Sequence, residues 1–187
     1  MNKNTLNITP PVAAKRPSIS TIHDHSRTDN YAWLRDKTRP EATEYLNAEN
    51  TFTKAHTQHT EKFKTSLYEE MLSHVEENDH STPVKVGDYF YYHRIDEGKQ
   101  YWAHYRKHRS LEAVEEVILD ENILAETGGH DYFELGALEV SPNHQWLAYS
   151  TDTTGAETFT VRIKNLKTGE LLDDVLENNA GCVSWGD

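Results

Sequence analysis

Two short stretches hold residue types that hydrolases use for catalysis, but neither has the arrangement that the chemistry requires. Acyl transfer at a serine needs that serine on a sharp strand-to-helix turn, written Gly-x-Ser-x-Gly, with backbone N–H donors for the oxyanion. Around Ser184, Gly186 is correctly placed, but Gly181 lies one position too far away. We therefore expect residues 182–185 to form a strand and not a nucleophile turn.

The second stretch is Asp24, His25 and Ser26, which are the three residue types of a catalytic triad in a row. Adjacent side chains diverge, whereas a triad is assembled by geometry from separate parts of a chain. We expect these residues to belong to a polar arm.

The 11 histidines raise the question of a metal site, and three pairs have suggestive spacing: His23 with His25, His56 with His59, and His104 with His108. The first pair lies in a predicted extended arm and lacks further ligands. The second shares a face of a predicted helix, but no zincin motif or third ligand accompanies it. The third lies in a predicted strand, where four residues span about 13 Å. We expect no metal, no cofactor and no catalytic residue in this chain.

Cys182 is the only cysteine, so an internal disulfide is excluded. No cationic residue precedes it closely, and a thiolate there has no visible support. We expect a small buried residue in a strand. A single cysteine is compatible with a reducing compartment.

The composition limits the classes of partner. Hydrophobic residues make up 36% of 187 positions, enough for one domain or part of a larger one. A formal net charge of −12 repels a phosphate backbone, so we expect no nucleic-acid partner. The charge attracts cationic peptides or simply confers solubility, and we favour the second interpretation. The sequence has neither a membrane-length apolar run nor a secretory signal at its start, so we expect no membrane partner and a cytoplasmic location.

The amino-terminal part of the chain is predicted to be an arm followed by helices. Three prolines, Pro10, Pro11 and Pro17, favour an irregular arm over residues 1–30. From about 38 to 78 apolar residues recur every three or four positions, which is typical of amphipathic helices. A capping-box pattern at 66–69 predicts that a second helix begins there.

From residue 84 the apolar period changes to two, which indicates strands. The predicted strands are 89–93, 100–106, 117–119, 135–140, 146–150, 159–163, 171–172 and 182–185. Groups of about four strands over 40 to 50 residues are typical of β-propeller blades. Because blades bury their faces only against neighbouring blades, we expect a truncated propeller with two blades and the start of a third.

Several motifs resemble those of the prolyl oligopeptidase family of serine peptidases. The segment Tyr31–Asp36 (YAWLRD) resembles the family's amino-terminal signature. Four further segments resemble the oligopeptidase B branch, namely 97–101 (EGKQY), 129–133 (GHDYF), 135–142 (LGALEVSP) and 152–157 (DTTGAE). The resemblance runs from about Pro10 to the last residue, with all five motifs in the expected order.

The resemblance implies a seven-bladed propeller over an α/β-hydrolase domain that cleaves short peptides after Arg or Lys. The fold class would be mainly β with an amino-terminal α-helical segment. Residues 1–83 would be an arm and helices that pack on the absent hydrolase domain, and 84–187 a partial propeller. The family's catalytic Ser, Asp and His, and the acidic residues that receive the basic side chain, match no position here. We therefore expect this chain alone to be inactive and to serve as a cap and substrate gate.

Tyr31, Trp33 and Arg35 stand at the junction between arm and helix. We expect the aromatic pair to anchor the junction by burying a large area. By position, Arg35 and Asp36 are candidates for hydrogen bonds to the absent catalytic domain.

Two other interpretations remain open. Two blades with helices could be a non-enzymatic binding module, or a degenerate remnant, that offers sheet edges to a partner. Alternatively, the parent enzyme belongs to the proline-specific branch of the family.

Overall fold

The computed structural model describes residues 9–186. The chain divides into two compact units, Met1–Val75 and Glu76–Asp187. Each unit is described by itself.

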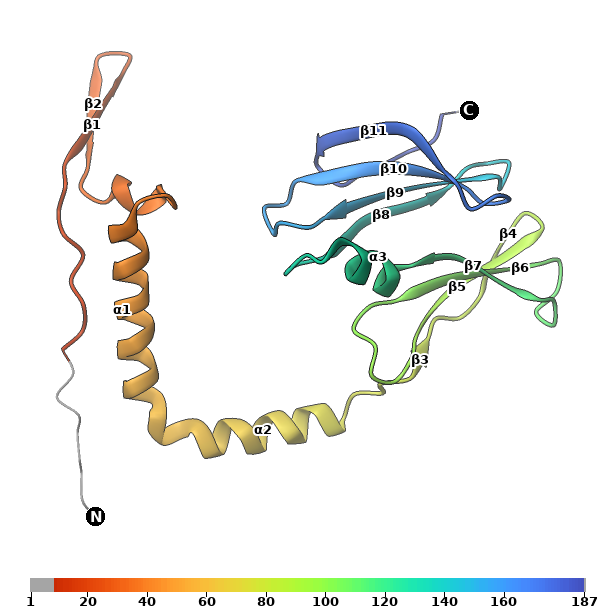
Figure 1. Cartoon of the computed structure of the whole chain (residues 1–187), viewed down its shortest axis with the longest axis horizontal. Coiled ribbons are helices and arrows are strands. Elements are labelled where there is room, and N and C mark those ends of the chain that lie inside the picture. The colour runs from red at the N-terminus through yellow and green to blue at the C-terminus, as the bar shows by residue number, and fades with distance from the viewer. Residues whose placement is uncertain (1–8, 187) are drawn as a thin grey trace. The chain divides into compact units, whose positions relative to one another are not determined.

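The first unit begins with an antiparallel hairpin of β1 (Ser18–Ile22) and β2 (His25–Asp29), coloured orange-red in Figure 1. His23 and Asp24 between the strands both have left-handed backbone conformations, with φ of 49° and 63°, as a two-residue type I′ turn requires. The prediction of an irregular arm over 1–30 was therefore wrong for residues 18–29. Both faces of this hairpin are exposed, so its sequence carries no alternation of apolar and polar residues.

A short 3₁₀ helix, η1 (Ala32–Arg35), leads into α1 (Pro40–Thr57) and, after a second 3₁₀ turn η2 (Gln58–Thr60), into α2 (Glu61–Ser73) (Figure 1). Pro40 lies in the first turn of α1, where its missing N–H costs nothing.

The helix break falls at 58–60 and not at the capping-box pattern of 66–69. Side chains at the break compete for backbone carbonyls: the Thr60 hydroxyl donates to the Thr57 carbonyl at 2.7 Å, and His59 Nδ1 lies 3.2 Å from the His56 carbonyl. Such local bonds favour a tightened 3₁₀ turn. Residues 66–69 consequently continue α2 and cap nothing.

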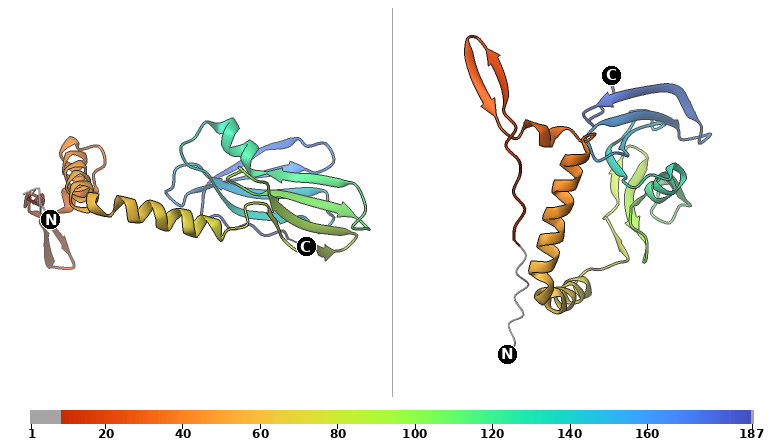
Figure 2. Two further views of the ribbon diagram at one scale, coloured as in Figure 1. Left: turned by 90° about the horizontal axis from the view of Figure 1, so that it is seen from below. Right: turned by 60° about the vertical axis from the view of Figure 1, so that its left-hand side comes forward.

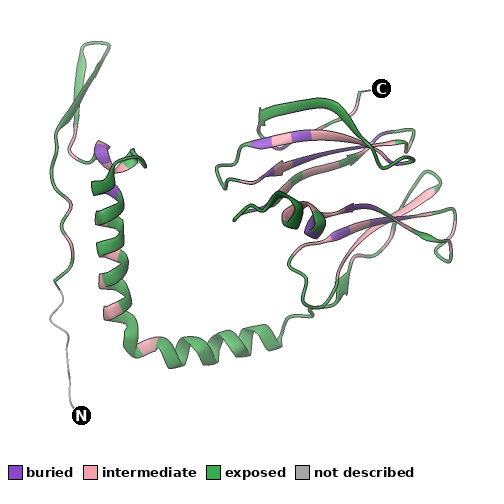
Figure 3. Ribbon diagram, in the orientation of Figure 1, coloured by how far each residue is buried: buried purple, intermediate pink, exposed green. Residues whose placement is uncertain are grey.

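The predicted apolar face of the helices is uncovered within this unit. Ala42 is the buried residue of α1, and α2 has none, as the green ribbon in Figure 3 shows. The exposed apolar side chains are Leu46, Phe63, Leu67, Tyr68, Met71 and Leu72.

The second unit contains two antiparallel sheets (Figures 1 and 2). The first sheet, called blade 1, contains β3 (Asp79–His80), β4 (Val84–Val86), β5 (Tyr89–Ile95), β6 (Ala103–His108) and β7 (Glu115–Asp120). Its strands run in the order β3-β5-β6-β7, with β4 also paired to β5. The predicted hairpin turn is confirmed, since Lys99 N–H donates to the Asp96 carbonyl at 2.9 Å.

A helix that the sequence analysis did not predict, α3 (Glu121–Gly128), follows blade 1. The Asp120 carboxylate accepts hydrogen bonds from the backbone N–H groups of Asn122 and Ile123, which caps the amino end of α3. Gly129 ends the helix in a left-handed conformation. The capping Asp120 and the terminating Gly129 are both visible in the sequence. Eight residues are too few, however, to show the apolar periodicity from which a helix is predicted.

The second sheet, called blade 2, contains β8 (Glu134–Val140), β9 (Trp146–Asp152), β10 (Phe159–Asn165) and β11 (Leu171–Asn179) in the order β11-β10-β9-β8. The strand β11 is much longer than the predicted 171–172. Residues 182–185 were predicted to form a strand, but they do not form one. No neighbouring strand pairs with them in the described part of the chain. The fold is thus mainly β with an amino-terminal helical segment and two open blades.

The core lies between the two blades. Ile118 and Leu119 of blade 1 pack with Leu147, Tyr149 and Leu166 of blade 2, and all five are almost fully buried. Burial of apolar surface is the dominant favourable term in such packing, so each blade stabilises the other.

Candidate functional site

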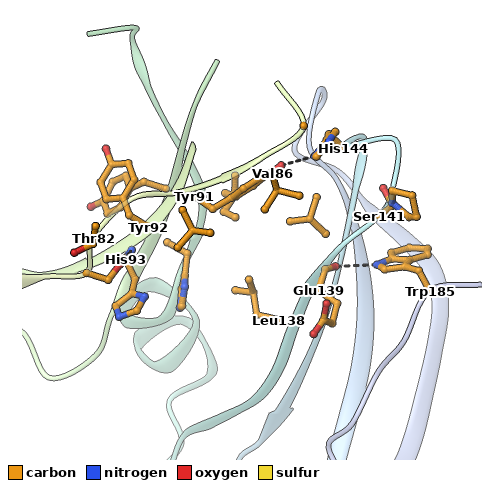
Figure 4. A pocket seen from close by; sticks show the side chains of 18 of the residues that line it. Thr82, Val86, Tyr91, Tyr92, His93, Leu138, Glu139, Ser141, His144 and Trp185 are labelled. Carbon is orange, nitrogen blue, oxygen red and sulfur yellow. Dashed lines mark hydrogen bonds between the residues drawn. The ribbon is translucent and has the colours of Figure 1, made fainter. Parts of the chain in front are cut away.

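A cavity of about 870 Å³ lies beside this core, between the two blades (Figure 4). Val84 and Val86 of β4 line one wall, and Leu138 and Val140 of β8 line another. Val84 and Val86 are 61% and 51% exposed, so the apolar wall of β4 is open to the cavity and is not packed. A cavity of this size, mostly apolar with a few polar groups, has the dimensions of a ligand pocket.

His93 and His104 form a polar side of the cavity. His104 Nε2 lies 2.7 Å from Oε1 of Glu121, a buried residue at the start of α3. His93 packs against the edge of Trp102 with ring centroids 4.6 Å apart. Burial, and then the electrostatic effect of the neighbouring His104, lower the pKa of His93. His93 therefore favours its neutral form.

Two tyrosines, Tyr92 and Tyr105, stack on each other along the same side, with ring centroids 5.5 Å apart. Burial and a hydrogen bond to the Glu115 carboxylate raise the pKa of Tyr92. Burial also raises the pKa of Tyr105. Both hydroxyls thus remain protonated at neutral pH. The Tyr92 hydroxyl donates to Glu115, and the Tyr105 hydroxyl accepts from Arg94 Nη2 at 3.0 Å.

Glu139 and Trp185 lie at the opposite side of the cavity (Figure 4). The Trp185 indole N–H donates to the Glu139 carbonyl at 2.9 Å, which fixes the segment after β11 against β8. Glu139 is exposed, and the lining contains no lysine or arginine. The cavity therefore favours apolar or cationic groups over anions.

Ser184 also lines this cavity, but its surroundings are not those of a nucleophile. It is exposed, follows no strand–helix turn, and has no hydrogen bond to an imidazole among the described residues. The preceding Gly181 is held in place by Ser150, whose hydroxyl donates to the Gly181 carbonyl at 2.7 Å. This stretch is a structural connection.

Asp24, His25 and Ser26 lie at the exposed tip of the β1–β2 hairpin. Ser26 and Thr21 face each other across the strands with hydroxyl oxygens 2.8 Å apart. The three side chains are not arranged as a catalytic triad.

The histidine pairs have separate roles. His56 stacks on Phe52 with ring centroids 5.5 Å apart, and His108 packs against Tyr89 in a tilted arrangement with centroids 5.0 Å apart. His104 is committed to Glu121. No group of three potential metal ligands occurs within residues 9–186.

Cys182 is exposed, so the prediction of a buried residue in a strand was wrong. The residues that follow β11 belong to no strand, so no sheet covers Cys182.

The junction between arm and helix has the anchor expected of Trp33, which is 7% exposed. Its indole N–H donates to the Ala14 carbonyl at 2.9 Å, and the Arg16 guanidinium lies 5.1 Å from its ring. Tyr31, the second member of the predicted pair, is 41% exposed and contributes less burial.

Asp36 is committed locally, with hydrogen bonds from Thr38 and Arg39 that lower its pKa. The side chain of Arg35 is 81% exposed and lies 4.0 Å from Asp29. Of the two residues proposed to reach another domain, Arg35 has the more exposed side chain, and its contact with Asp29 is a weak ion pair at the limit of such distances.

The sequence analysis assigned no role to Asp152, the first residue of the 152–157 motif. This buried carboxylate accepts hydrogen bonds from Thr154, Gly155 and Glu157 at 2.7 to 3.2 Å. Burial alone would raise its pKa, but these bonds lower it overall. The motif is therefore a loop that folds around one carboxylate. An Asp side chain commonly accepts hydrogen bonds from the backbone of the residues that follow it in a turn.

None of the helices among residues 9–186 is both long enough and apolar enough to cross a bilayer.

Comparison with known proteins identifies the family. The prolyl oligopeptidase N-terminal β-propeller domain matches residues 10–187. Dipeptidyl aminopeptidase BI of Pseudoxanthomonas mexicana is 37% identical over 96% of this chain and 27% of its own length. Protease 2 of Moraxella lacunata is 36% identical over 94% of this chain and 26% of its own length.

Solved structures agree. Oligopeptidase B from Leishmania major superimposes with a TM-score of 0.84 and 29% identity, over 96% of this chain and 28% of that protein. Prolyl oligopeptidase B from Galerina marginata gives 0.70 at 15% identity, which shows the shared fold. The chain spans about a quarter of the length of these relatives. Because the family match covers nearly every residue, the chain belongs to the prolyl oligopeptidase family, within its N-terminal β-propeller domain.

Proposed function

We propose that this chain is the amino-terminal part of a serine-type oligopeptidase that cleaves short peptides after Arg or Lys. The observation that carries the proposal is the TM-score of 0.84 with oligopeptidase B, against 0.64 and 0.70 with two prolyl-specific relatives. The resemblance of the sequence motifs points to the same branch.

In this proposal residues 1–83 are the arm and helices that pack on an α/β-hydrolase domain, and 84–187 are the first part of the propeller. The exposed apolar side chains of α1 and α2 support a docking role, since contiguous exposed apolar surface commonly marks an interaction site. Arg35 is available for a polar contact at that interface.

The chemistry of cleavage belongs to the rest of the enzyme. A serine attacks the peptide carbonyl while a histidine removes its proton, and both residues lie outside this chain. The part described here limits access, acting as a cap and substrate gate. The exposed Glu139 and a cavity lining without lysine or arginine support a preference for cationic peptides over anionic ones. Basic short peptides and the hydrolase domain are the proposed partners, and the cytoplasm is the proposed location.

A second candidate is removal of dipeptides from free amino termini. The observation that favours it is the 37% identity to a relative named dipeptidyl aminopeptidase. A free-amine requirement would separate this activity from endopeptidase cleavage.

The test uses the intact protein that contains this chain, with arginyl, lysyl and prolyl amide substrates. We expect kcat/KM for arginyl and lysyl substrates to exceed that for prolyl ones by about 100-fold or more, because a site built for a charged group rejects analogues that lack it. A prolyl preference would move the enzyme to the other branch. Cleavage of dipeptidyl substrates with a free amine, but not of blocked ones, would support the second candidate.

The same protein preparation also tests the binding-module interpretation. An intact mass near 21.5 kDa with no cleavage of any substrate would contradict the oligopeptidase proposal.

A further inference from the structure

The turn between β8 and β9 is held in shape by its own residues. The Ser141 hydroxyl donates to Asn143 Oδ1 at 2.8 Å and accepts from the Trp146 N–H at 3.0 Å. His144 N–H donates to the Ser141 carbonyl at 2.8 Å, and His144 has a left-handed backbone with φ of 58°. Blade 2 thus presents His144 in a fixed position.

The imidazole of His144 is surrounded by residues of blade 1. Its Nδ1 lies 2.9 Å from the Tyr91 hydroxyl, a contact drawn in Figure 4, and its ring lies 5.1 Å from that of Tyr89. At Gly87 a Cβ atom would lie 2.6 Å from His144 Nε2, so only glycine admits the ring there. The socket formed by Gly87, Tyr89 and Tyr91 therefore fits this side chain closely.

The backbone of His144 is also held by blade 1. Arg106 Nη1 donates to the His144 carbonyl at 2.7 Å. Arg106 is 5% exposed and is itself fixed by two hydrogen bonds to Glu116, at 2.7 and 2.9 Å, and by the face of Tyr89 at 4.5 Å. A charged donor that is already immobilised loses little further entropy when it binds the carbonyl.

From these contacts we infer that His144 is a latch that locks blade 2 to blade 1, so that the two blades move as one body. A second tether supports this inference, since Lys164 Nζ of β10 donates to the Ile118 carbonyl of β7 at 3.0 Å. Together with the apolar core, these contacts oppose separation of the blades. The inference does not depend on the proposed cleavage specificity.

The test is hydrogen exchange of backbone amides in the intact protein, read from peptides that cover 87–92 and 141–146. The His144→Asn variant removes the imidazole but keeps a residue that tolerates the left-handed backbone. We expect exchange in both peptides to become about tenfold faster, because about 1.4 kcal/mol of contact is lost. Tyr91→Phe removes one hydrogen bond and should give about a threefold increase.

Gln145→Ala is the matched control, because Gln145 is the exposed neighbour of His144 in the same turn. We expect its exchange rates to equal those of the parent protein. Faster exchange that is confined to 141–146 would overturn the inference, because the latch must also protect blade 1. A uniform increase throughout β10 and β11 would overturn it as well, since it would reveal general destabilisation.

Discussion

Trp33 and Ala14 are joined by a 2.9 Å hydrogen bond from the indole N–H to the backbone carbonyl, across 19 residues of sequence. This bond ties the arm to the start of the helical segment. The arm before β1 has little other burial, so its position depends on this contact and on Arg16, which covers the same ring.

Trp33→Phe should loosen the arm. The substitution keeps most of the apolar area but removes the N–H donor and weakens the cation–π contact, at a cost of about 1–2 kcal/mol. Limited proteolysis within residues 9–17 should become about tenfold faster. Tyr31→Phe, at a half-exposed neighbour, should leave the rate unchanged, and an unchanged rate for Trp33→Phe would contradict the anchor role.

Asp152 should make stability depend on pH in the acid range. Its folded-state pKa is lowered by hydrogen bonds, so its contribution is present above its unfolded pKa of about 4 and is lost as pH falls through the lowered value. Asp152→Asn should therefore be less stable at neutral pH and show a flatter decline between about pH 5 and pH 2. Thermal unfolding across this range measures the effect, with Thr153→Ser in the same loop as a control that changes no titratable group and should keep the parental slope.

Gly136 should tolerate no side chain. A Cβ there would lie 2.6 Å from the Phe159 ring and 2.7 Å from the Ser150 hydroxyl, which itself bonds Ala137 N–H and the Gly181 carbonyl. Overpacking of this kind costs about 1–3 kcal/mol. Denaturant unfolding should show this loss for Gly136→Ala and none for Gly186→Ala, where a Cβ meets no atom within 4 Å. Equal stability of the two variants would refute the close packing.

Ser184→Ala in the intact protein should leave peptide cleavage within about twofold of the parental rate. Loss of a true nucleophile lowers kcat by about 10⁶-fold, so the two outcomes are well separated. A large loss of activity, with stability against unfolding unchanged, would identify Ser184 as catalytic. It would contradict the assignment of the segment after β11 as a structural connection.

Most strands of the two blades could be predicted because they bury apolar side chains. The segments around Tyr91, Val117, Leu147 and Val161 are short runs rich in aromatic and β-branched residues, with buried or half-buried positions. The β1–β2 hairpin escaped prediction for the opposite reason, since it buries neither face. The helix break at Thr57–Thr60 depends on competing hydroxyl bonds, which leave no signal in apolar periodicity.

The inter-blade features are harder to predict from sequence. Gly87, Tyr91, Arg106 and His144 lie up to 57 positions apart, and only the packing of two sheets brings them together. The expectation that Cys182 is buried failed because it assumed a strand, and a strand requires a partner that no local pattern can supply.

The order of strands within the blades has a consequence for assembly during synthesis. In blade 2 every strand pairs with its neighbour in sequence, and in blade 1 β5, β6 and β7 do the same. Pairing between consecutive strands closes short loops, which is fast and requires no distant segment. Each blade can therefore form as soon as its last strand leaves the ribosome, and blade 1 can serve as the template on which blade 2 docks.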